Sequence, residues 1–445
     1  MSFESALLNL VVWLPLAGAV LNGLFGKHPT APRRFALFFS MVVLFLSVWL
    51  FFSFSFRPSA SGYQFEVQPP PLWIAAFNSF YRLGLDGISL PLVLLNAFLS
   101  FLAVVISWNE SKRPQLYFSM LLVLETAVMG VFSSLDLFLF FLFWELELAP
   151  MYLLIGIWGG PRREYAAMKF IIYTIAGSAL MLIGILALYF ATGAGSFDIT
   201  TITRSVPALG VTPQIVIFLL LFAGFAVKVP VWPFHTWLPD AHVEAPTPVS
   251  VLLAGVLLKM GGYGLLRICV GILPDAATAL AWLLGLLAVI NVLYGAAVAM
   301  AQSDLKKMIA NSSISHMGYV LLGLAALNQI GLEGATLQMV THGTITGLLF
   351  MMVGVVYDRT HTREIPLMQG LASRMPITAT LFAMAGLASL GLPLMSGFVA
   401  EFVVFIGAYQ VWPVHTILAA RRPRTCNSFD PSFRSRLDLA DRMIE

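Results

Sequence analysis

Residues 225–242 read FAVKVPVWPFHTWLPDAH and place a lysine and three prolines at the end of an apolar run. Pro230 has no N–H to donate to the carbonyl of Ala226, and Pro233 has none for Val229, so a helix that reaches this stretch must open around Lys228. Inside a membrane, irregular backbone is tolerated only where protein buries it or water fills it. The stretch therefore predicts a hydrated, movable site. The alternative, a simple proline kink with a snorkelling lysine, is disfavoured because about ten apolar residues precede Lys228.

The composition of the whole chain places this stretch in a membrane. Of its 445 residues, 59% are apolar and 11% are charged, against roughly 25% charged in an ordinary soluble domain. Apolar runs of about 20 residues recur along the chain, and each is long enough to cross a hydrocarbon core of about 30 Å. These features exclude a water-soluble protein and predict an all-α polytopic membrane protein.

A hydropathy scan predicts about twelve membrane spans, near residues 6–25, 35–56, 88–107, 115–133, 136–158, 168–192, 214–238, 247–273, 277–300, 309–328, 334–357 and 376–411. Loops after odd-numbered spans carry twelve Lys and Arg residues and those after even-numbered spans carry four, so the odd loops are expected on the cytoplasmic or matrix side. Residues 1–411 form the predicted transmembrane domain. Residues 412–445 have too few consecutive apolar residues for another crossing and are expected to be an extramembranous basic tail.

A second interrupted helix is predicted at residues 389–402, SLGLPLMSGFVAEF, where Gly391, Pro393 and Gly397 precede Glu401. Two broken helices in corresponding positions indicate a transporter built from inverted repeats, with ions handled near the membrane midplane.

Ionisable residues far from any span end are the main candidates for function, because a charge at a helix centre costs about 2.5 to 3.5 kcal/mol on insertion scales. Such residues are Glu125, Glu145, Glu147, Lys228, Lys259, His316, His342 and Glu401. One interpretation is structural ion pairs that hold helices together. We favour a proton relay, because acids stand at both ends of the series with lysines and histidines between them, and each of these groups can change its charge.

Glu145 and Glu147 are two residues apart, about 200° around a regular helix, and cannot share one face. We predict that Glu145 is the buried partner of Lys228. Glu147 is then expected to point toward a neighbouring subunit or a polar cavity.

Cofactor sites within the chain are not expected. Cys269 and Cys426 form no CxxC pair, so iron–sulfur clusters, structural zinc and a disulfide framework lack ligands. Basic residues form no stripe suited to nucleic acid.

The histidines leave two questions open. His316 and His342 could hold a haem, but such cytochromes usually need two histidine pairs, and the other candidates, His235 and His242, lie in a proline-rich segment. The segment 235–244 is interpreted either as a water-exposed funnel or as a solvated loop.

Several stretches of the sequence resemble the antiporter-like membrane subunits of respiratory complex I, and within them the chain 4 (chain M) branch. They are residues 225–267 around the doubled proline break, DLKKMIANSSISHMGYV (304–320), LDGISLPLV (85–93), LFWELELAPMYLLIGIWGG (142–160) and YDRTHTREIPLMQGL (357–371). AGVLLKMGGYG (254–264) points to this branch rather than to chains 2 or 5 or to the sodium/proton antiporters. The matching region runs from roughly residue 85 to 410.

The resemblance implies an antiporter-like fold and a role for each matching residue. Glu145 would be the acid paired with Lys228, Lys259 the central lysine, His316 and His342 the bridging histidines, and Glu401 the terminal acid. The resemblance also implies that NADH, FMN, iron–sulfur clusters and ubiquinone are bound by partner subunits. The implied partners of this chain are the antiporter-like chains 2 and 5 and membrane lipids. Proton movement would be coupled to NADH:ubiquinone oxidoreduction.

Three functions remain open on the sequence: a proton-translocating subunit of complex I, an independent cation/proton antiporter, and a scaffold that no longer pumps. The strong apolarity and the lack of a transit segment fit a product made inside an organelle or a bacterium. VLETAVMGVF (123–132) resembles mitochondrial and alphaproteobacterial versions, so the mitochondrial inner membrane is expected, with a bacterial plasma membrane as the alternative.

Overall fold

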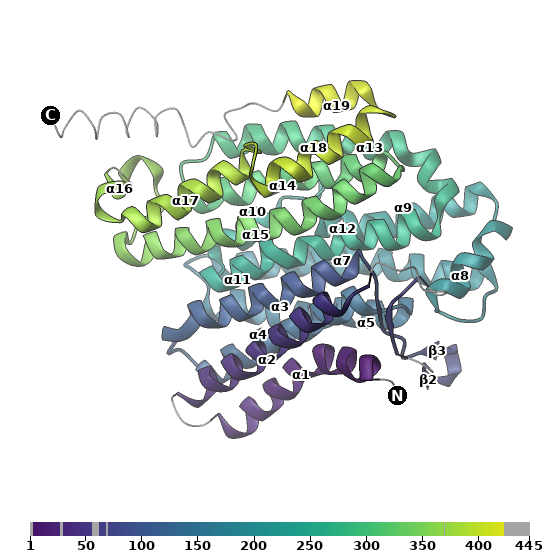
Figure 1. The fold of residues 1–445 in the computed structure, drawn as a ribbon, viewed down its shortest axis with the longest axis horizontal. Helices are drawn as coiled ribbons and strands as arrows, with labels where there is room; N and C mark the ends of the chain where they lie inside the picture. Colours follow the sequence, from purple (N-terminus) through teal and green to yellow (C-terminus); the bar gives the residue numbers. More distant parts are fainter. Residues whose placement is uncertain (1–2, 27–29, 56–61, 68–69, 369, 422–445) are drawn as a thin grey trace. The chain divides into compact units, whose positions relative to one another are not determined.

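The computed structural model describes residues 3–26, 30–55, 62–67, 70–368 and 370–421, and these are mostly helical (Figure 1). The chain divides into two compact units. Unit 1 comprises Met1–Lys228 and Val256–Ala279, and unit 2 comprises Val229–Gly255 and Leu280–Glu445.

Unit 1 is an assembly of helices with two short antiparallel strand pairs, β1 with β4 and β2 with β3. Its helices are α1 (Phe3–Phe25), α2 (Ala31–Ser53), α3 (Ser89–Ile106), α4 (Pro114–Ser133), α5 (Leu137–Leu146), α6 (Leu148–Trp158), α7 (Arg163–Thr192), α8 (Ile199–Ser205), α9 (Val211–Lys228) and α12 (Leu258–Gly264). The strands are β1 (Phe65–Glu66), β2 (Leu72–Ile74), β3 (Ser79–Phe80) and β4 (Gly84–Leu85). Short 3₁₀ turns are η1 (Ala75–Phe77), η2 (Ser107–Asn109) and η3 (Val206–Ala208), and η5 (Leu265–Val270) is a π-helical turn.

Small residues let helices of unit 1 approach one another closely, as is typical of membrane helices. α7 packs along α9. A Cβ on Gly184 would lie 2.9 Å from the side chain of Leu221, and one on Gly224 would lie 2.7 Å from Cβ of Met181. The two helices could not keep this spacing with larger residues at these positions.

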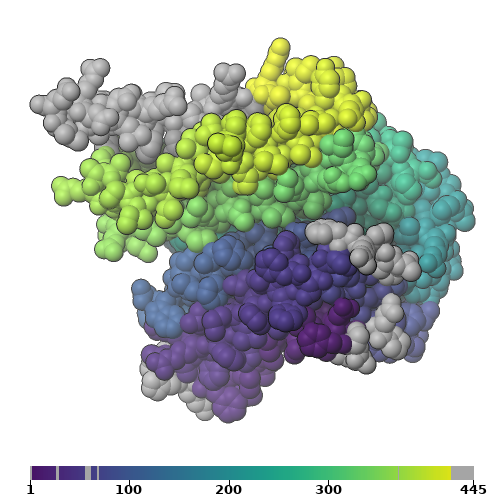
Figure 2. All heavy atoms as spheres, in the orientation of Figure 1, coloured from purple at the N-terminus to yellow at the C-terminus, as the bar shows by residue number. Residues whose placement is uncertain are grey.

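Other helices of unit 1 turn large apolar side chains outward. On α2, which lies in the purple part of Figure 2, the outward-facing side chains include Phe38, Phe45, Trp49 and Phe52. A helix exposes such a surface when its surroundings are lipid or a partner protein rather than water.

Unit 2 contains α10 (Trp237–Glu244), α11 (Thr247–Leu252), α14 (Leu305–Ala325), α15 (Gln329–Thr360), η6 (Ile365–Leu367), α16 (Leu371–Arg374), α17 (Pro376–Ser389), α18 (Ser396–Tyr409) and α19 (Pro413–Ala420). α15 packs on both α14 and α18. Again glycines allow the contact, since a Cβ on Gly334 would lie 2.7 Å from the backbone nitrogen of Val404. The chain passes between the units at three points: directly after Lys228, within the π-helical turn η4 (Leu253–Leu257) and within α13 (Pro274–Met300).

Ten helical segments of the described residues are long and apolar enough to cross a membrane, and each coincides with one of the twelve predicted spans. The predicted span 309–328 is helical as α14, but its buried Asn311, Ser312, Ser313 and Ser315 keep its hydropathy below that of the other ten. The predicted span 376–411 consists of two shorter apolar helices, α17 and α18. The polytopic all-α fold predicted from the sequence is confirmed.

Both predicted helix breaks are present. α9 ends at Lys228 and the chain resumes helical structure only at Trp237, and α17 and α18 are separated by residues 390–395. The inverted-repeat relation of the two breaks stays a prediction. So does the tail at 412–445, which begins with α19 and whose residues 422–445 lie outside the described residues.

Candidate functional site

A buried ion pair in unit 1 joins the end of α9 to the junction of α5 and α6. Nζ of Lys228 donates to Oε1 of Glu147, and the side chains are 1% and 0% exposed. Nζ also lies 5.4 Å from the ring centre of Trp144 and 5.6 Å from that of Phe170. Aromatic faces stabilise a desolvated cation, so carboxylate and rings together hold the lysine charge away from water.

The partner of Lys228 differs from the predicted one. The prediction that Glu145 is the buried partner is wrong, and so is the prediction that Glu147 points toward a neighbouring subunit or a polar cavity. The expected angle of about 200° between the side chains of Glu145 and Glu147 assumed that one regular helix carries both. Instead α5 ends at Leu146 and α6 begins at Leu148, which leaves Glu147 at the junction.

Pro150 is the sequence signal that could have located this junction. A helix continuing through it would need an N–H from Pro150 for the carbonyl of Leu146, and proline has none. Within a new helix that starts at Leu148, the same position is one of the first four, whose N–H groups have no intrahelical acceptor.

Glu145 lies five residues before Pro150 and is half-buried. Within the described part of the chain, its Oε1 is buried without a hydrogen-bond partner, as is Oε2 of Glu147. The role predicted for Glu145 in proton transfer stays a prediction.

Lys259 and Glu125 are two further buried ionisable residues of unit 1. Lys259 is 0% exposed on α12, directly between the π-helical turns η4 and η5. Hydropathy predicted one regular span here and gave no sign of these turns, which interrupt regular hydrogen bonding and are frequent at functional sites. Glu125 on α4 is 1% exposed, and among the described residues neither of its carboxylate oxygens has a hydrogen-bond partner.

Unit 2 brings together three of the predicted residues. Nδ1 of His316 on α14 lies 3.4 Å from Oε1 of Glu401 on α18, and its ring centre lies 5.4 Å from that of His342 on α15. Nε2 of His316 lies 2.9 Å from Oγ of Ser389, the last residue of α17. Ser389 was not predicted as a site residue, although it stands next to the predicted break.

The haem interpretation of His316 and His342 is disfavoured by these contacts. Both ring nitrogens of His316 already face protein partners, Ser389 and Glu401, whereas a haem ligand needs a ring nitrogen for iron. Among the described residues, no group of three or more His, Cys, Asp or Glu could hold a metal ion.

Gly391 in the break of unit 2 allows the acid to sit there. Its backbone has a φ of +68°, and a Cβ at this position would lie 2.8 Å from Oε2 of Glu401. A larger residue would strain the backbone and collide with the carboxylate, so the glycine makes room for it.

The proline-rich segment after the α9 break is mostly buried. His235, His242 and Glu244 are 5%, 0% and 6% exposed. The His242 ring stacks on Phe350 with ring centres 4.6 Å apart. The solvated-loop interpretation is therefore wrong for these three side chains.

Two cations meet the carboxyl end of α10. Nζ of Lys306 donates to the carbonyl of Ala245, and Nη1 of Arg363 donates to the carbonyl of Val243 at 2.8 Å. The last carbonyls of a helix carry partial negative charge and favour cations. These contacts hold the end of α10 in place, a role that the sequence analysis did not assign to either residue.

Lys306 precedes the predicted span 309–328 and is 4% exposed. Burial, together with the nearby charge of Arg363, lowers the pKa of Lys306 to about 7, although Asp304 and Glu244 oppose the shift. This ammonium group is thus half-charged near neutral pH.

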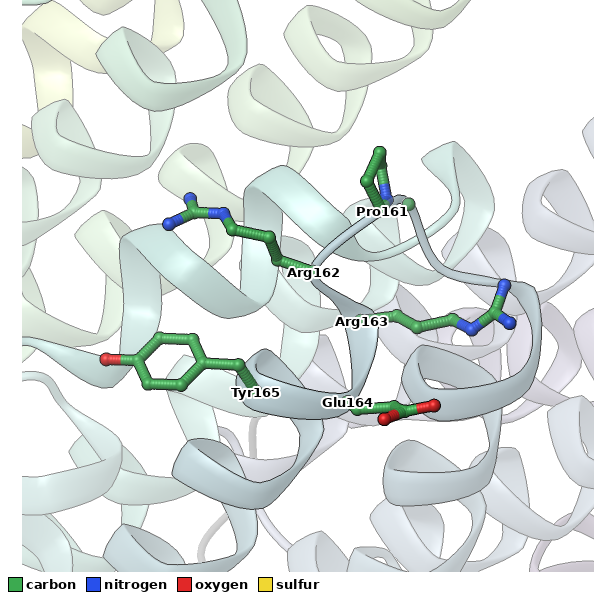
Figure 3. A pocket seen from close by; sticks show the side chains of 6 residues that line it. Pro161, Arg162, Arg163, Glu164 and Tyr165 are labelled. Carbon is green, nitrogen blue, oxygen red and sulfur yellow. The ribbon is translucent and has the colours of Figure 1, made fainter.

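A cavity of about 530 Å³ lies outside these clusters, at the turn between α6 and α7. It is lined by residues 160–165, and Figure 3 shows the side chains of Arg162 and Arg163 directed away from each other. It shares no residue with the buried groups above, and its arginines belong to a loop on the predicted positive side.

Comparison with known proteins gives a consistent result. Residues 134–421 match the family described as NADH:quinone oxidoreductase/Mrp antiporter, transmembrane. The chain is 46% identical over 420 residues to NADH-quinone oxidoreductase subunit M of Rhodobacter capsulatus, covering 91% of this chain and 81% of that protein. It is 44% identical over 407 residues to NAD(P)H-quinone oxidoreductase chain 4 1 of Synechococcus sp. (strain JA-3-3Ab), covering 91% and 76%.

Solved structures agree on the fold. A chain of respiratory complex I from Thermus thermophilus with bound NADH matches with a TM-score of 0.86 and 30% identity, over 94% of this chain and 86% of that one. A chain of the Mrp complex from Dietzia sp. DQ12-45-1b matches with a TM-score of 0.83 and 24% identity, over 94% and 46%. The second likeness shows the fold alone. The antiporter-like fold predicted from the sequence is confirmed.

Proposed function

Because the chain belongs to the NADH:quinone oxidoreductase/Mrp antiporter family, we propose that it is the proton-translocating chain 4 (subunit M) of a respiratory complex I. The observation that carries the proposal is the ion pair of Lys228 and Glu147, buried between apolar helices of unit 1. An ion pair away from water is costly, and one at the end of a broken helix is suited to opening and closing.

The chemistry of the pair follows from its burial. A carboxylate beside an ammonium stabilises the charged forms of both groups, and desolvation opposes them. When the pair separates, the lysine releases its proton more readily and the carboxylate accepts one more readily. A small movement at the break after Lys228 is thereby converted into proton transfer.

We assign the other buried groups to the same transfer. Lys259 lies between two π-helical turns of unit 1, and His316, His342 and Glu401 form the cluster of unit 2. Glu145 keeps its proposed place beside the pair. A histidine between an acid and a second imidazole can accept a proton on one nitrogen and release one from the other.

Redox chemistry is assigned to other subunits. We propose that NADH, FMN, iron–sulfur clusters and ubiquinone are bound by partners, that this chain holds no cofactor, and that chains 2 and 5 are its neighbours with membrane lipids. The enzyme is then the whole NADH:ubiquinone reductase, of which this chain is one subunit.

A bacterial plasma membrane is the location we propose. The relatives that carry the family assignment come from Rhodobacter and Synechococcus. The mitochondrial inner membrane expected from the sequence has no support from these comparisons.

Replacing Lys228 with Ala in the assembled complex tests the function. In inverted membrane vesicles we expect NADH:quinone turnover and coupled proton movement to fall sharply. The matched control is Lys169→Ala on α7, a lysine that also lies over an aromatic ring, that of Tyr165, and this variant should behave as the parent. Unchanged proton movement in Lys228→Ala would contradict the proposal and favour a scaffold.

Two further measurements complete the test. Lys228→Ala leaves Glu147 without its cation. A second variant, Glu401→Gln, therefore tests the function in unit 2, where Glu401 faces a histidine instead of a lysine. Glu401→Gln should also reduce proton movement. Co-purification of the chain with flavin-bearing subunits is expected. Isolation of the chain without such partners, with cation/proton exchange activity, would favour an independent antiporter.

A further inference from the structure

The junction of α5 and α6 carries two carboxyl groups beside a single cation. Glu147 forms the ion pair with Lys228, and Glu145, two residues earlier, interacts with Glu147 electrostatically. One oxygen of each carboxyl group is buried and has no hydrogen-bond partner among the described residues, Oε1 of Glu145 and Oε2 of Glu147. Each of these oxygens is an acceptor that can take a proton or a further hydrogen bond.

Charge balance limits the state of this group of three. With Lys228 charged and both carboxyl groups ionised, one negative charge would remain uncompensated beside a fully buried pair, which is strongly unfavourable. The neutral state has one carboxylate next to the ammonium and one carboxylic acid.

The two carboxyl groups differ in access. Glu147 is 0% exposed, whereas Glu145 is half-buried. A proton reaches Glu145 from outside the helix packing more easily than it reaches Glu147.

We propose, on the basis of the function above, that Glu145 and Glu147 are alternative partners of Lys228 and exchange one proton as the lysine moves between them. With Lys228 on Glu147, Glu145 is the carboxylic acid. When the ammonium moves to Glu145, the O–H bond of Glu145 breaks and an O–H bond forms on Glu147. The net charge of the three groups stays constant, and the proton passes from the more accessible carboxyl group to the buried one.

The break between α5 and α6 makes the exchange geometrically reasonable. On one regular helix the two carboxyl groups would point to different sides, but the chain leaves the α5 helix at Leu146 and restarts at Leu148. Trp144 stays beside the cation at 5.4 Å. Because Trp144 directly precedes Glu145, the ammonium already faces the ring of a residue next to the one that carries the second carboxyl group.

The test uses Glu145→Gln, Glu147→Gln and the double variant in the intact complex, with Glu164→Gln, an exposed acid at the start of α7, as the control. Each single variant should assemble, because the remaining carboxylate pairs with Lys228. Each should lose coupled proton movement by at least about tenfold, because the exchange needs both groups. The double variant should also lose thermal stability of the complex, since Lys228 then has neither partner.

Three results would overturn the inference. Parental proton movement in Glu145→Gln would leave Glu147 as the sole partner, and parental proton movement in Glu147→Gln would do the same for Glu145. Stability of either single variant as low as that of the double variant would exclude exchange of partners. Lys228→Ala separates this inference from the proposed function. If Lys228→Ala keeps proton movement, the proposed function itself fails. If Lys228→Ala loses proton movement while Glu145→Gln and Glu147→Gln keep it, only the proposed exchange fails.

Discussion

Removing the cation of the buried pair should destabilise the protein far more than removing both partners. Lys228→Met keeps much of the side-chain volume but leaves Glu147, which is 0% exposed, without its ammonium partner. Breaking a buried ion pair on one side costs about 3 to 5 kcal/mol, and this equals a factor of roughly 10² to 10³ or more in the ratio of folded to unfolded chain. Lost contacts of Nζ with the two aromatic rings add about 0.5 to 2 kcal/mol.

The double variant Lys228→Met/Glu147→Gln provides the comparison. It removes both charges of the pair, so most of the lost stability should return, as replacing a buried pair by neutral groups is often nearly neutral. Proton movement should not return. This combination distinguishes a relay from structural glue, because glue that can be replaced by neutral groups would leave transport intact.

The assay is the thermal midpoint for dissociation of the purified assembly, measured for the parent, both variants and Lys169→Met, a control at a half-buried lysine of α7. We expect the order parent, then the double variant, then Lys228→Met. A midpoint of Lys228→Met equal to that of the parent would refute the reasoning, and so would a double variant as unstable as Lys228→Met.

Two other predictions concern Lys306 and Gly264. Burial holds the pKa of Lys306 at about 7, against about 10.4 in an unfolded chain. Between these two pH values the folded chain binds fewer protons than the unfolded chain, so the free energy of unfolding rises with pH over this window. Lys306→Met should reduce the gain in thermal midpoint between pH 7 and pH 9, and an equal gain in parent and variant would contradict the pKa. In Gly264→Ala, the new Cβ would lie 2.2 Å from the ring of Phe225, so stability should fall by about 1 to 3 kcal/mol. Gly23→Ala, where nothing lies within 4 Å, is the control, and equal midpoints of the two alanine variants would exclude the predicted collision.

Local features of the chain were predicted well because they depend on neighbouring residues only. Hydropathy is a property of a window of about 20 residues, and ten of the predicted spans coincide with long apolar helices. The breaks after Lys228 and ahead of Glu401 follow from prolines and glycines within a few residues. The π-helical turns beside Lys259 were not predicted, because apolar residues of this kind are equally compatible with a regular helix.

The pairing of side chains was predicted less well. His316, His342 and Glu401 do meet in unit 2, but Glu147 takes the place given to Glu145 beside Lys228. Lys306 and Arg363 lie in loops between the predicted spans, but Lys306 binds the carbonyl of Ala245, directly after α10, and Arg363 binds that of Val243 in α10. These contacts join residues 61 to 120 positions apart along the chain.

By itself, the sequence determined that this protein is a bundle of membrane helices with buried titratable groups and interrupted helices, since apolar length and missing N–H groups act locally. Only the tertiary structure decided which acid holds Lys228 and which serine and acid face His316. The physical reason is that an ion pair or hydrogen bond forms between atoms brought within a few ångströms, and that proximity depends on how whole helices pack and on where each one is interrupted.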